Sequence, residues 1–553
     1  MDIKQLLHNA IIKAAQQAIA DGAFHAEELP AVVLEVPPQK EFGDYATNFA
    51  LQAARAARTK PRAIAEALVA RLNETWLTKA EIAGPGFINF YLKSDWLYDM
   101  LAAILTQGET YGNTTAGAGQ RVQVEYVSAN PTGPLHVGHG RGAAVGSALV
   151  NLLKAAGYDV QSEYYINDAG NQIDNLAASV NARYLELLGQ TAEFPADGYH
   201  GRDIIDTAQR IIDHDGDKYL HMDAAERLAI FKELALQEKL AALKEDLQAF
   251  NVDFDVWFSE RTLHQSGAIA QTCKLLQANG TMYEQDGALW LKSTCYGDDK
   301  DRVVIRDNGI PTYLAADIAY HRDKAERGFD TLINIWGADH HGYICRVKAA
   351  MAALGYNSDM LEVLVLQMVS LYQNGELVKM SKRTGQSVTL TELIEEVGRD
   401  AARFFFIMRS IDSQLDFDLD LAKSRSNENP VYYIQYAHAR IASIFRQAAE
   451  AGIDGRWEKT ELSVLTTPFE IDLIKKMGGY PEEIAFAAAD RAPHRIARYA
   501  HDLATLFHSF YNQCRIVGVE PELAAARLAL VTAVQTTIRH ALTLLGIDAP
   551  EKM

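Results

Sequence analysis

The sequence predicts a mixed α/β protein built on a Rossmann-like parallel sheet, with a small α+β domain before it and an all-helical domain after it. Three observations support this fold class. Strand-like apolar runs alternate with helical patterns from residue 121 to about 400, which is typical of a parallel sheet covered by helices. Beyond about residue 421 the strand signal fades and long helical patterns dominate. The 553 residues also exceed the roughly 250 to 300 that one hydrophobic core holds.

The first region, residues 1–112, mixes helical segments with short strand-like runs. These runs include "AVVLEVP" at 31–37 and "GFINFYL" at 86–92. The small and polar residues of "GNTTAGAGQ" at 112–120 are typical of a linker. We therefore expect one α+β domain over 1–112.

The second region, residues 113–420, carries the clearest strand patterns. They are "RVQVEYV" at 121–127, "YDVQSEYYI" at 158–166, "TLINIWG" at 331–337 and "EVLVLQMVSL" at 362–371. From about 190 to 290 the pattern changes to charged helical sequence, followed by the hairpin-like "MYEQDGALWLK". We expect this stretch to be an insertion into the sheet domain.

The third region, residues 421–553, is expected to be helical, and it contains a candidate basic face. The net charge of −19 and the pI of about 5.3 argue against a nucleic-acid partner, but binding to phosphates needs only a local basic surface. Arg491, Arg495 and Arg498 are spaced i, i+4 and i+7, which predicts one helical stripe. An ordinary solvated helix face explains the same spacing equally well.

Composition also excludes some classes of protein. The cysteines are few and far apart, so they form neither a disulfide framework nor a CxxC zinc pair. No window of 18 uncharged apolar residues occurs, and the first 24 residues form an amphipathic helical pattern without the features of a signal peptide. We expect a cytoplasmic protein that has no membrane partner and holds no structural metal.

A glycine-rich segment, "NPTGPLHVGHGRG" at 130–142, lies between the first strand of the sheet and a helical pattern that stops at Gly157. With the strand that follows, this order predicts a βαβ unit. Ligands of open α/β sheets bind at the carboxyl ends of the strands, where this loop is expected. His136 and His139 therefore belong to a candidate nucleotide site.

A second segment, "GELVKMSKRTGQSVTL" at 375–390, places Lys379, Ser381 and Lys382 around a predicted turn. Either this tetrad or the HxGH pattern alone is a weak signal. Together they match one chemistry, because attack on the α-phosphorus of ATP builds up charge that must be met from both sides. Imidazole N–H donors at a helix start can meet one side, and lysines on a closing loop the other.

The motifs "HVGH" and "KMSKR" resemble the two signatures of class I aminoacyl-tRNA synthetases, and the surrounding sequence is similar to the arginyl-tRNA synthetases. Val137 stands where the first signature usually has isoleucine. The similarity extends through "YYINDAGNQI", "IPTYLAADIAYHRDK", "IWGADHHGY", "NPVYYIQYAHARI" and the terminal "LLGIDAPEKM". The N-terminal "FGDYATNFA" and "GPGFINFYL" resemble that family's extra domain, which is implicated in contacts to the elbow of the tRNA.

The resemblance implies roles for individual residues. For ATP it implies His136, Gly138, His139, Gly337, Asp339, Lys379, Met380, Ser381 and Lys382, of which the two histidines and two lysines are catalytic. For arginine it implies Glu125, Asn130, Tyr313 and Asp317. The last four suit the ligand, because a planar guanidinium with five donors is best held by carboxylates and an aromatic face.

Simpler interpretations of these residues stay open. Glu125 is also explained as an ordinary carboxylate on the polar face of a strand. Tyr313 and Asp317 could be plain helix surface, although their i, i+4 spacing would direct both toward one ligand. His340 and His341 are explained as structural residues, and no third ligand at metal-binding spacing accompanies them.

The resemblance also implies contacts to tRNA. Phe87 and Asn89, in the N-terminal strand-like run, are candidates for reading an exposed base, although an aromatic residue in a strand is more often core. The helical domain is expected to hold the anticodon. Its candidate contacts are Tyr432, Tyr436 and the stripe of Arg491, Arg495 and Arg498.

The activity that the resemblance implies is arginine–tRNA ligation, with tRNA(Arg), L-arginine and ATP as partners and Mg²⁺ on the phosphates. We expect a monomer. One alternative is a nucleotidyl-transferring enzyme of the same fold with a small-molecule acceptor, which would leave the helical C-terminal region without a role. The other is a noncatalytic tRNA-binding protein, which would have no need of both signatures.

Overall fold

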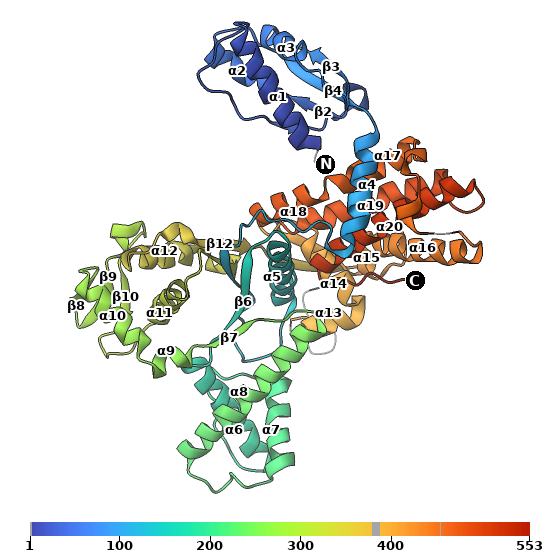
Figure 1. Cartoon of the computed structure of the whole chain (residues 1–553). Coiled ribbons are helices and arrows are strands. Elements are labelled where there is room, and N and C mark those ends of the chain that lie inside the picture. Colours follow the sequence, from blue (N-terminus) through green and yellow to red (C-terminus); the bar gives the residue numbers. More distant parts are fainter. Residues whose placement is uncertain (1–2, 379–386, 454) are drawn as a thin grey trace. The chain divides into compact units, whose positions relative to one another are not determined.

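The computed structural model describes residues 3–378, 387–453 and 455–553 (Figure 1). The chain divides into two compact units, and the helical C-terminal region contributes residues to both. Unit 1 comprises Met1–Tyr111, Ser443–Gly479 and Leu506–Thr536, and unit 2 comprises Gly112–Ala442, Tyr480–Thr505 and Thr537–Met553.

The N-terminal part of unit 1 is the expected α+β structure. Its antiparallel sheet has the order β1-β2-β4-β3, with β1 at Leu34–Glu35, β2 at Tyr45–Thr47, β3 at Leu77–Ala83 and β4 at Phe87–Leu92. The helices are α1 (Ile3–Ala20), α2 (Phe49–Ala57) and α3 (Pro61–Val69). They share one buried core with the sheet. The predicted run at 31–37 forms only the two-residue β1, because proline lacks the N–H needed to extend a ladder past Pro37.

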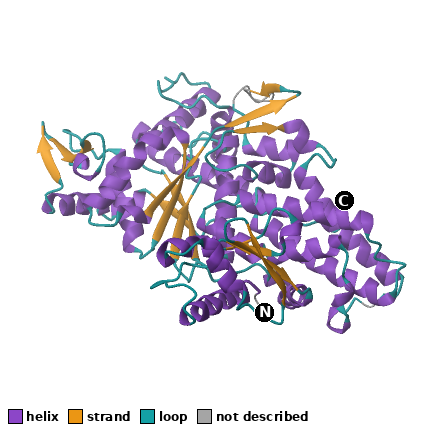
Figure 2. Cartoon of the chain, turned by 90° about the horizontal axis from the view of Figure 1, so that it is seen from above, coloured by secondary structure: helices purple, strands orange, loops and turns teal. Residues whose placement is uncertain are grey.

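Unit 2 is built on a five-stranded sheet of order β12-β11-β5-β6-β7 in which every pair is parallel. The strands are β5 (Arg121–Glu125), β6 (Asp159–Ile166), β7 (Val256–Ser259), β11 (Thr331–Gly337) and β12 (Leu361–Leu366). The chain starts at β5, adds strands on one side, then crosses over and adds β11 and β12 on the other. This is the doubly wound Rossmann order, which confirms the predicted fold class and puts the switch point between β5 and β11. Figure 2 shows the strands with helices packed along them.

The predicted βαβ unit is confirmed as β5, α5 (Val137–Ala155) and β6. Gly157 follows the end of α5 with φ of 88°, and a Cβ there would lie 2.7 Å from the carbonyl oxygen of Thr114. Glycine is needed because the left-handed conformation and the close approach both exclude a side chain. The expected linker at 112–120 accordingly packs on α5, and the N–H of Thr114 donates to the carbonyl of Ala155 at 2.8 Å.

The stretch from 190 to 290 is largely helical but is not wholly outside the sheet. Helices α6 (Asn171–Leu187), α7 (Arg202–Asp215) and α8 (Ala224–Ala249) form a cluster with its own buried core. The chain then returns to the sheet as β7, a strand that the sequence did not predict. The elements that follow are α9 (Arg261–Gln265), α10 (Ala268–Ala278), β8 (Met282–Gln285), β9 (Ala288–Leu291) and β10 (Arg302–Ile305).

The predicted hairpin is confirmed as β8 and β9, which pair antiparallel. Asp286 and Gly287 form its two-residue turn with φ of 54° and 77°. Positive φ at both positions matches the twist of the flanking strands, which is why Asp-Gly is favoured there.

The rest of unit 2 surrounds the second half of the sheet. Helices α11 (Tyr313–Glu326) and α12 (Ile344–Ala353) flank β11 in the sequence. The predicted strand at 362–371 divides into β12 and β13 (Val369–Gln373). Strand β13 lies in a small sheet of order β14-β13-β15, with β14 at Glu376–Val378 and β15 at Leu415–Asp418. Short helices α13 (Leu390–Val397), α14 (Arg399–Ile407) and α15 (Leu419–Lys423) complete this part.

The C-terminal region is helical, as predicted. It contains α16 (Pro430–Glu450), α17 (Pro468–Gly478), α18 (Tyr480–Ala489), α19 (His494–Gln513) and α20 (Pro521–Leu544), and α4 (Asp95–Gln107) packs on α17 within unit 1. Within the described part of the chain, every helix is too short or too polar to cross a bilayer.

Candidate active site

A cavity of about 1140 Å³ opens in unit 2 at the carboxyl ends of the parallel strands. Its walls come from the segment after β5, the start of α5, the residue after β7, one face of α11, the segment after β11 and parts of β12, β13 and β14. This is the switch point of the doubly wound sheet, where ligands of such folds bind. Nine predicted residues line the cavity: Glu125, Asn130, His136, Gly138, His139, Tyr313, Asp317, Gly337 and Asp339.

The two histidines lie at the start of α5, and each ring accepts a hydrogen bond from a backbone N–H group of this turn. The N–H of Gly138 donates to Nδ1 of His136 at 3.1 Å, and the N–H of His136 donates to Nδ1 of His139 at 3.3 Å. The rings stack with their centroids 3.7 Å apart. Since a neutral imidazole has one N–H and both Nδ1 atoms accept, each ring has its proton on Nε2, available to a ligand.

Both imidazoles are neutral donors at physiological pH. Burial lowers the pKa of His136 from its ordinary value. Burial, together with the neighbouring His136, lowers the pKa of His139 to about 4. The start of α5 therefore offers two N–H donors and the positive end of a helix dipole to an anion, without a titrating charge.

The glycines around the histidines answer packing demands. A Cβ on Gly138 would lie 3.1 Å from the ring of His136, and one on Gly140 would lie 2.8 Å from Leu390. Farther along α5, a Cβ on Gly146 would lie 2.3 Å from the ring of Tyr126. A side chain at Gly146 would push α5 away from Tyr126 at the end of β5, and one at Gly140 would push it away from α13 and α14.

The chain turns sharply between β5 and the histidine loop. Val127 and Ser128 have φ of 67° and 41°, a conformation that is rare outside glycine and costs on the order of 1 to 3 kcal/mol per residue. The turn is held by Ser128, whose N–H donates to the carbonyl of Tyr126 at 2.9 Å and whose Oγ accepts from the N–H of Tyr165 at 3.1 Å. Asn130 reaches the cavity wall beyond this turn.

Three carboxylates also line the cavity: Glu125 on β5, Asp317 on α11 and Glu260 directly after β7. The hydroxyl of Tyr343 donates to Oδ2 of Asp317 at 2.5 Å. Burial raises the pKa of Asp317 to about 7, and the negative Glu125 and Glu260 add to the rise against the hydrogen bond from Tyr343. The three carboxylates thus make this cavity complementary to a cation.

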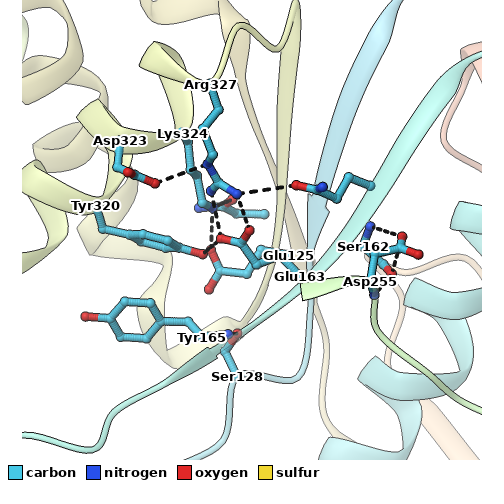
Figure 3. A network of polar contacts seen from close by, with 12 residues as sticks. Glu125, Ser128, Ser162, Glu163, Tyr165, Asp255, Tyr320, Asp323, Lys324 and Arg327 are labelled. Carbon is cyan, nitrogen blue, oxygen red and sulfur yellow. Dashed lines mark hydrogen bonds and ion pairs between the residues drawn. The ribbon is translucent and has the colours of Figure 1, made fainter. Parts of the chain in front are cut away.

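Beneath the carboxylates, polar side chains are buried between the sheet and α11 (Figure 3). We call Glu125, Glu163, Tyr320, His321, Lys324 and Asn334 the buried polar layer, and the half-buried Arg327 lies at its edge. Nζ of Lys324 lies 2.5 Å from Oε2 of Glu125 and 2.9 Å from Oδ1 of Asn334. Arg327 makes a two-pronged contact with Glu163 at 2.5 and 2.9 Å. The alternation of apolar and polar residues along β5 predicts a polar face that includes Glu125. That face is covered by α11, and the buried polar layer supplies the partners of its polar side chains.

Comparison with known proteins extends these findings along the whole chain. The family models that match are "Arginyl tRNA synthetase N terminal domain" over residues 1–92, "tRNA synthetases class I (R), catalytic domain" over 100–409 and "DALR anticodon binding domain" over 434–553. The arginine–tRNA ligase of Heliobacterium modesticaldum is 54% identical over the full length of both chains. The chain belongs to the arginyl-tRNA synthetase family.

Further similar proteins support the assignment of this chain to the arginyl-tRNA synthetase family. The arginine–tRNA ligase of Carboxydothermus hydrogenoformans is 55% identical, and the alignment covers 97% of each chain. The solved arginyl-tRNA synthetase of Thermus thermophilus is 26% identical, with a TM-score of 0.76 over 99% of this chain and 100% of that one. The cavity lies wholly within the match to the catalytic domain of class I synthetases.

Gly337 and Asp339 are two of the residues expected to contact ATP. Gly337 is the last residue of β11, and Asp339 follows two residues later. A Cβ on Gly337 would lie 2.5 Å from Oδ1 of Asp339. Asp339 is exposed into the cavity, with Nε2 of His340 3.4 Å from its carboxylate. In residues 3–378, 387–453 and 455–553, no three metal-ligating side chains lie together.

The second signature of the synthetases follows a hairpin on the cavity wall. Strands β13 and β14 pair through an Asn374–Gly375 turn, and Leu377 and Val378 line the cavity. Lys379, Met380, Ser381 and Lys382 lie outside the described residues. The chain returns beside the first signature, because the N–H of Leu390 donates to the carbonyl of Leu135 at 2.7 Å.

The candidate tRNA contacts are not among the residues that line the cavity. Phe87 is 39% exposed on β4, whereas Asn89 is buried. Tyr432 and Tyr436 stack on α16 with ring centroids 6.0 Å apart. None of these observations tests a contact to RNA.

The prediction that Arg491, Arg495 and Arg498 share one helical stripe is wrong. Helix α19 begins at His494, after Pro493, and Arg491 precedes it with a left-handed φ of 53°. Arg491 forms a two-pronged ion pair with Glu362 at 3.0 and 3.1 Å, and Arg495 one with Glu483. Only Arg498 of the three is exposed.

Sequence reasoning missed Glu260, the third carboxylate of the cavity. Its side chain is 6% exposed, and the amide of Asn167, oriented to suit its neighbours, donates to Oε2 of Glu260 at 3.1 Å. Asp168 holds the same turn by accepting from the N–H of Arg261 at 3.0 Å. Asn167 and Asp168 follow β6 directly. Polar residues at the carboxyl end of a parallel strand indicate a binding site, so this pair was a signal that the cavity extends to this side of the sheet.

Proposed function

We propose that this cavity activates L-arginine with ATP to arginyl-adenylate and then transfers arginine to the 3′ end of tRNA(Arg), releasing AMP and diphosphate. One observation carries the proposal: a single cavity at the switch point is lined both by two neutral imidazole donors and by three carboxylates. The imidazole donors suit the phosphates of ATP, and the carboxylates suit the guanidinium and α-ammonium groups of arginine. The chain's family membership supports the same activity.

In the first step, an oxygen of arginine's carboxylate attacks the α-phosphorus of ATP, and the bond to the leaving diphosphate breaks. We assign His136 and His139 to the phosphate oxygens through their Nε2–H groups, and Lys379 and Lys382 to the charge that develops on the opposite side. Gly138, Met380 and Ser381 are assigned to ATP contacts, and Gly337 and Asp339 to the adenosine. Catalysis then consists of orientation and charge stabilisation, and needs no side-chain nucleophile.

Arginine recognition divides between the ends of the substrate. We assign the guanidinium to Asp317 and Glu260, with the ring of Tyr313 against the side chain, since two carboxylates match a planar fork of donors. We assign the α-ammonium to Glu125 and Asn130, which lie near the histidine loop. The carboxylate then points toward the ATP side, where the reaction occurs.

In the second step, a terminal ribose hydroxyl of the tRNA attacks the carbonyl carbon of the adenylate, and AMP leaves. Mg²⁺ is proposed as the partner of the ATP phosphates, with its remaining ligands from water. The described residues present no protein cage for it, so we derive no step through a protein-held metal.

For the tRNA we propose Phe87 and Asn89 in the N-terminal domain and Tyr432, Tyr436 and the three arginines in the helical domain as contacts. Arg498 is the strongest of the arginines, because Arg491 and Arg495 are already paired with carboxylates. We also propose domains at 1–112, 113–420 and 421–553, a monomer and a cytoplasmic location, in keeping with a role in translation.

The decisive experiment is charging of total tRNA with each of the twenty labelled amino acids in turn. We expect label on tRNA with arginine alone, and only when ATP is present. Charging with another amino acid would overturn the substrate assignment. Adenylate formation without any transfer to tRNA would favour a small-molecule acceptor instead.

A further inference from the structure

We propose that Arg141 is a positioning residue for formation of the adenylate. It anchors the glycine-rich start of α5 to the cavity wall, so that His136 and His139 hold their N–H groups where charge develops on the phosphates. The inference rests on the proposed function, which assigns the two histidines to ATP. It adds to them a buried residue that is not among those that line the cavity.

The start of α5 has few side chains with which to pack. Residues 138–144 read "GHGRGAA", so Arg141 is the only side chain larger than a methyl group between His139 and Val145. Glycine is also a poor helix former, because it loses more backbone freedom on folding than any other residue. The turn that presents the histidines therefore depends on contacts outside the helix, and Arg141 is the long side chain that can make them.

The guanidinium of Arg141 joins α5 to two segments that come 226 and 269 residues later in the chain. Nη1 donates to the carbonyl of Gln367 at 2.8 Å, and Nη2 donates to the carbonyl of Ser410 at 2.9 Å. The two segments also bind one another, since the N–H of Gln367 donates to the carbonyl of Ile411 at 3.1 Å. Gln367 lies between β12 and β13 and lines the cavity. Arg141 thus attaches the histidine helix to this part of the cavity wall.

The chemistry of this contact favours a role in placement over a role in stability. Arg141 is fully buried, and its hydrogen bonds to Gln367 and Ser410 go to backbone carbonyls rather than to a carboxylate. Burial lowers the pKa of the guanidinium to about 10, against a smaller opposite effect of Asp412. An apolar side chain would avoid the cost of burying this charge. What the guanidinium adds is a planar fork of donors that holds two segments at once.

A second attachment of the histidine loop makes the effect of Arg141 separable from folding of the loop. The N–H of Leu390 donates to the carbonyl of Leu135 at 2.7 Å, and the N–H of Val137 donates to the carbonyl of Val388 at 3.3 Å. These backbone bonds do not depend on the side chain at position 141. Loss of Arg141 should therefore displace the histidines without unfolding the loop.

The part of the cavity that we assign to arginine does not involve this helix. Its three carboxylates come from β5, α11 and the residue after β7, and none lies on α5. Loss of Arg141 should therefore disturb the phosphate donors and leave arginine binding nearly unchanged. This difference between the two substrates distinguishes positioning from general structural support.

The test is exchange between ATP and diphosphate in the presence of arginine and tRNA, which reports adenylate formation alone. For Arg141→Met we expect kcat of exchange to fall by about 10²-fold, because a misplacement of about 1 Å costs that much. Arginine KM should stay within about threefold. Arg141→Lys keeps the charge but reaches only one of the two carbonyls, so its kcat should fall by about tenfold.

A double-variant cycle shows whether Arg141 acts through the histidines. If it does, Arg141→Met should lower kcat by less than about tenfold once His139→Ala has removed one of the two donors. If it acts elsewhere, the two losses should multiply. If Arg141→Met does not fold, Arg141→Lys is taken through the same cycle, and its loss should shrink from about tenfold to about threefold or less.

Arg227→Met is the matched control in unit 2. Arg227 is another buried arginine, and its guanidinium donates to three backbone carbonyls at 3.2 to 3.4 Å and to Oδ1 of Asn181 at 2.6 Å. It does not line the cavity. Arg227→Met should leave kcat within about threefold, both in the unaltered protein and in the His139→Ala background.

Full kcat in a folded Arg141→Met variant would overturn the inference. A loss confined to ATP KM, an equal rise in arginine KM, or losses that multiply with His139→Ala would overturn it as well. Absence of arginine-dependent exchange in the unaltered protein would instead remove the proposed function. The two failures are therefore distinguishable.

Discussion

Asp317→Asn is the sharpest test of the arginine pocket, because it changes charge with almost no change in shape. The hydroxyl of Tyr343 donates to Asp317 across 2.5 Å. In the variant, that donor would hold the amide oxygen and turn the NH₂ group toward the substrate. A donor would then face the donors of the guanidinium, and the cation would lose its partner.

The size of the effect follows from burial and from the pKa. Leaving a buried charge without its partner costs about 3 to 5 kcal/mol. Burial raises the pKa of Asp317 to about 7, so at pH 7 ionising it for arginine offsets only a small part of that difference. Each 1.4 kcal/mol is about tenfold, and we expect arginine kcat/KM to fall by roughly 10² to 10³-fold.

The assay is steady-state aminoacylation with arginine and ATP varied in turn. ATP KM should change by no more than about threefold, because we assign ATP to other residues of the cavity, among them the two histidines. Asp323→Asn is the matched control on the same helix, since Asp323 does not line the cavity. Unchanged arginine kinetics in Asp317→Asn would refute the assignment, and equal losses for arginine and ATP would indicate a damaged fold.

Three other predictions follow from the site and the family. Since the raised pKa leaves Asp317 neutral below pH 7, arginine kcat/KM should rise about tenfold per pH unit up to about 6.5 and level off above 7.5, and a flat profile would contradict this. Lys382→Ala should lower kcat of adenylate formation by roughly 10²-fold or more with little change in arginine KM, whereas loss of ATP binding at constant kcat would make Lys382 a ground-state contact. Exchange between ATP and diphosphate in the presence of arginine should be negligible until tRNA is added, and strong exchange in its absence would show that the site forms without tRNA.

The sequence predicted best where local pattern and tertiary role coincide. Apolar runs such as 331–337 became central strands, and the small residues before α5 became the tight loop that they suggested. Strand β7 was missed because its four residues follow the polar, acidic stretch "NVDFD" and carry no alternation of their own. The arginine stripe failed because Pro493 sets the start of α19, so Arg491 never joins the helix.

The site was predictable only in part, since burial is a property of the assembled fold. Alternation identified Glu125 as a polar-face residue, but it cannot distinguish a face covered by α11 from one in water. Lys324 could not be singled out either, because a helical pattern does not show that this lysine is buried against the sheet. Glu260 reaches the cavity from the far edge of the sheet, more than 50 residues before Asp317 in the chain, and no local pattern links the two.

The three cavity carboxylates come from segments that the fold alone unites: the end of β5, the residue after β7 and the second turn of α11. A growing polypeptide must extend beyond residue 317 before all of these groups exist, and β11 must then insert beside β5 to bring α11 over the sheet. The arginine site that we propose would therefore exist in the completed domain and not in its partial forms. Free arginine should act as a folding ligand, shifting the equilibrium toward the finished structure in proportion to the logarithm of its concentration above Kd.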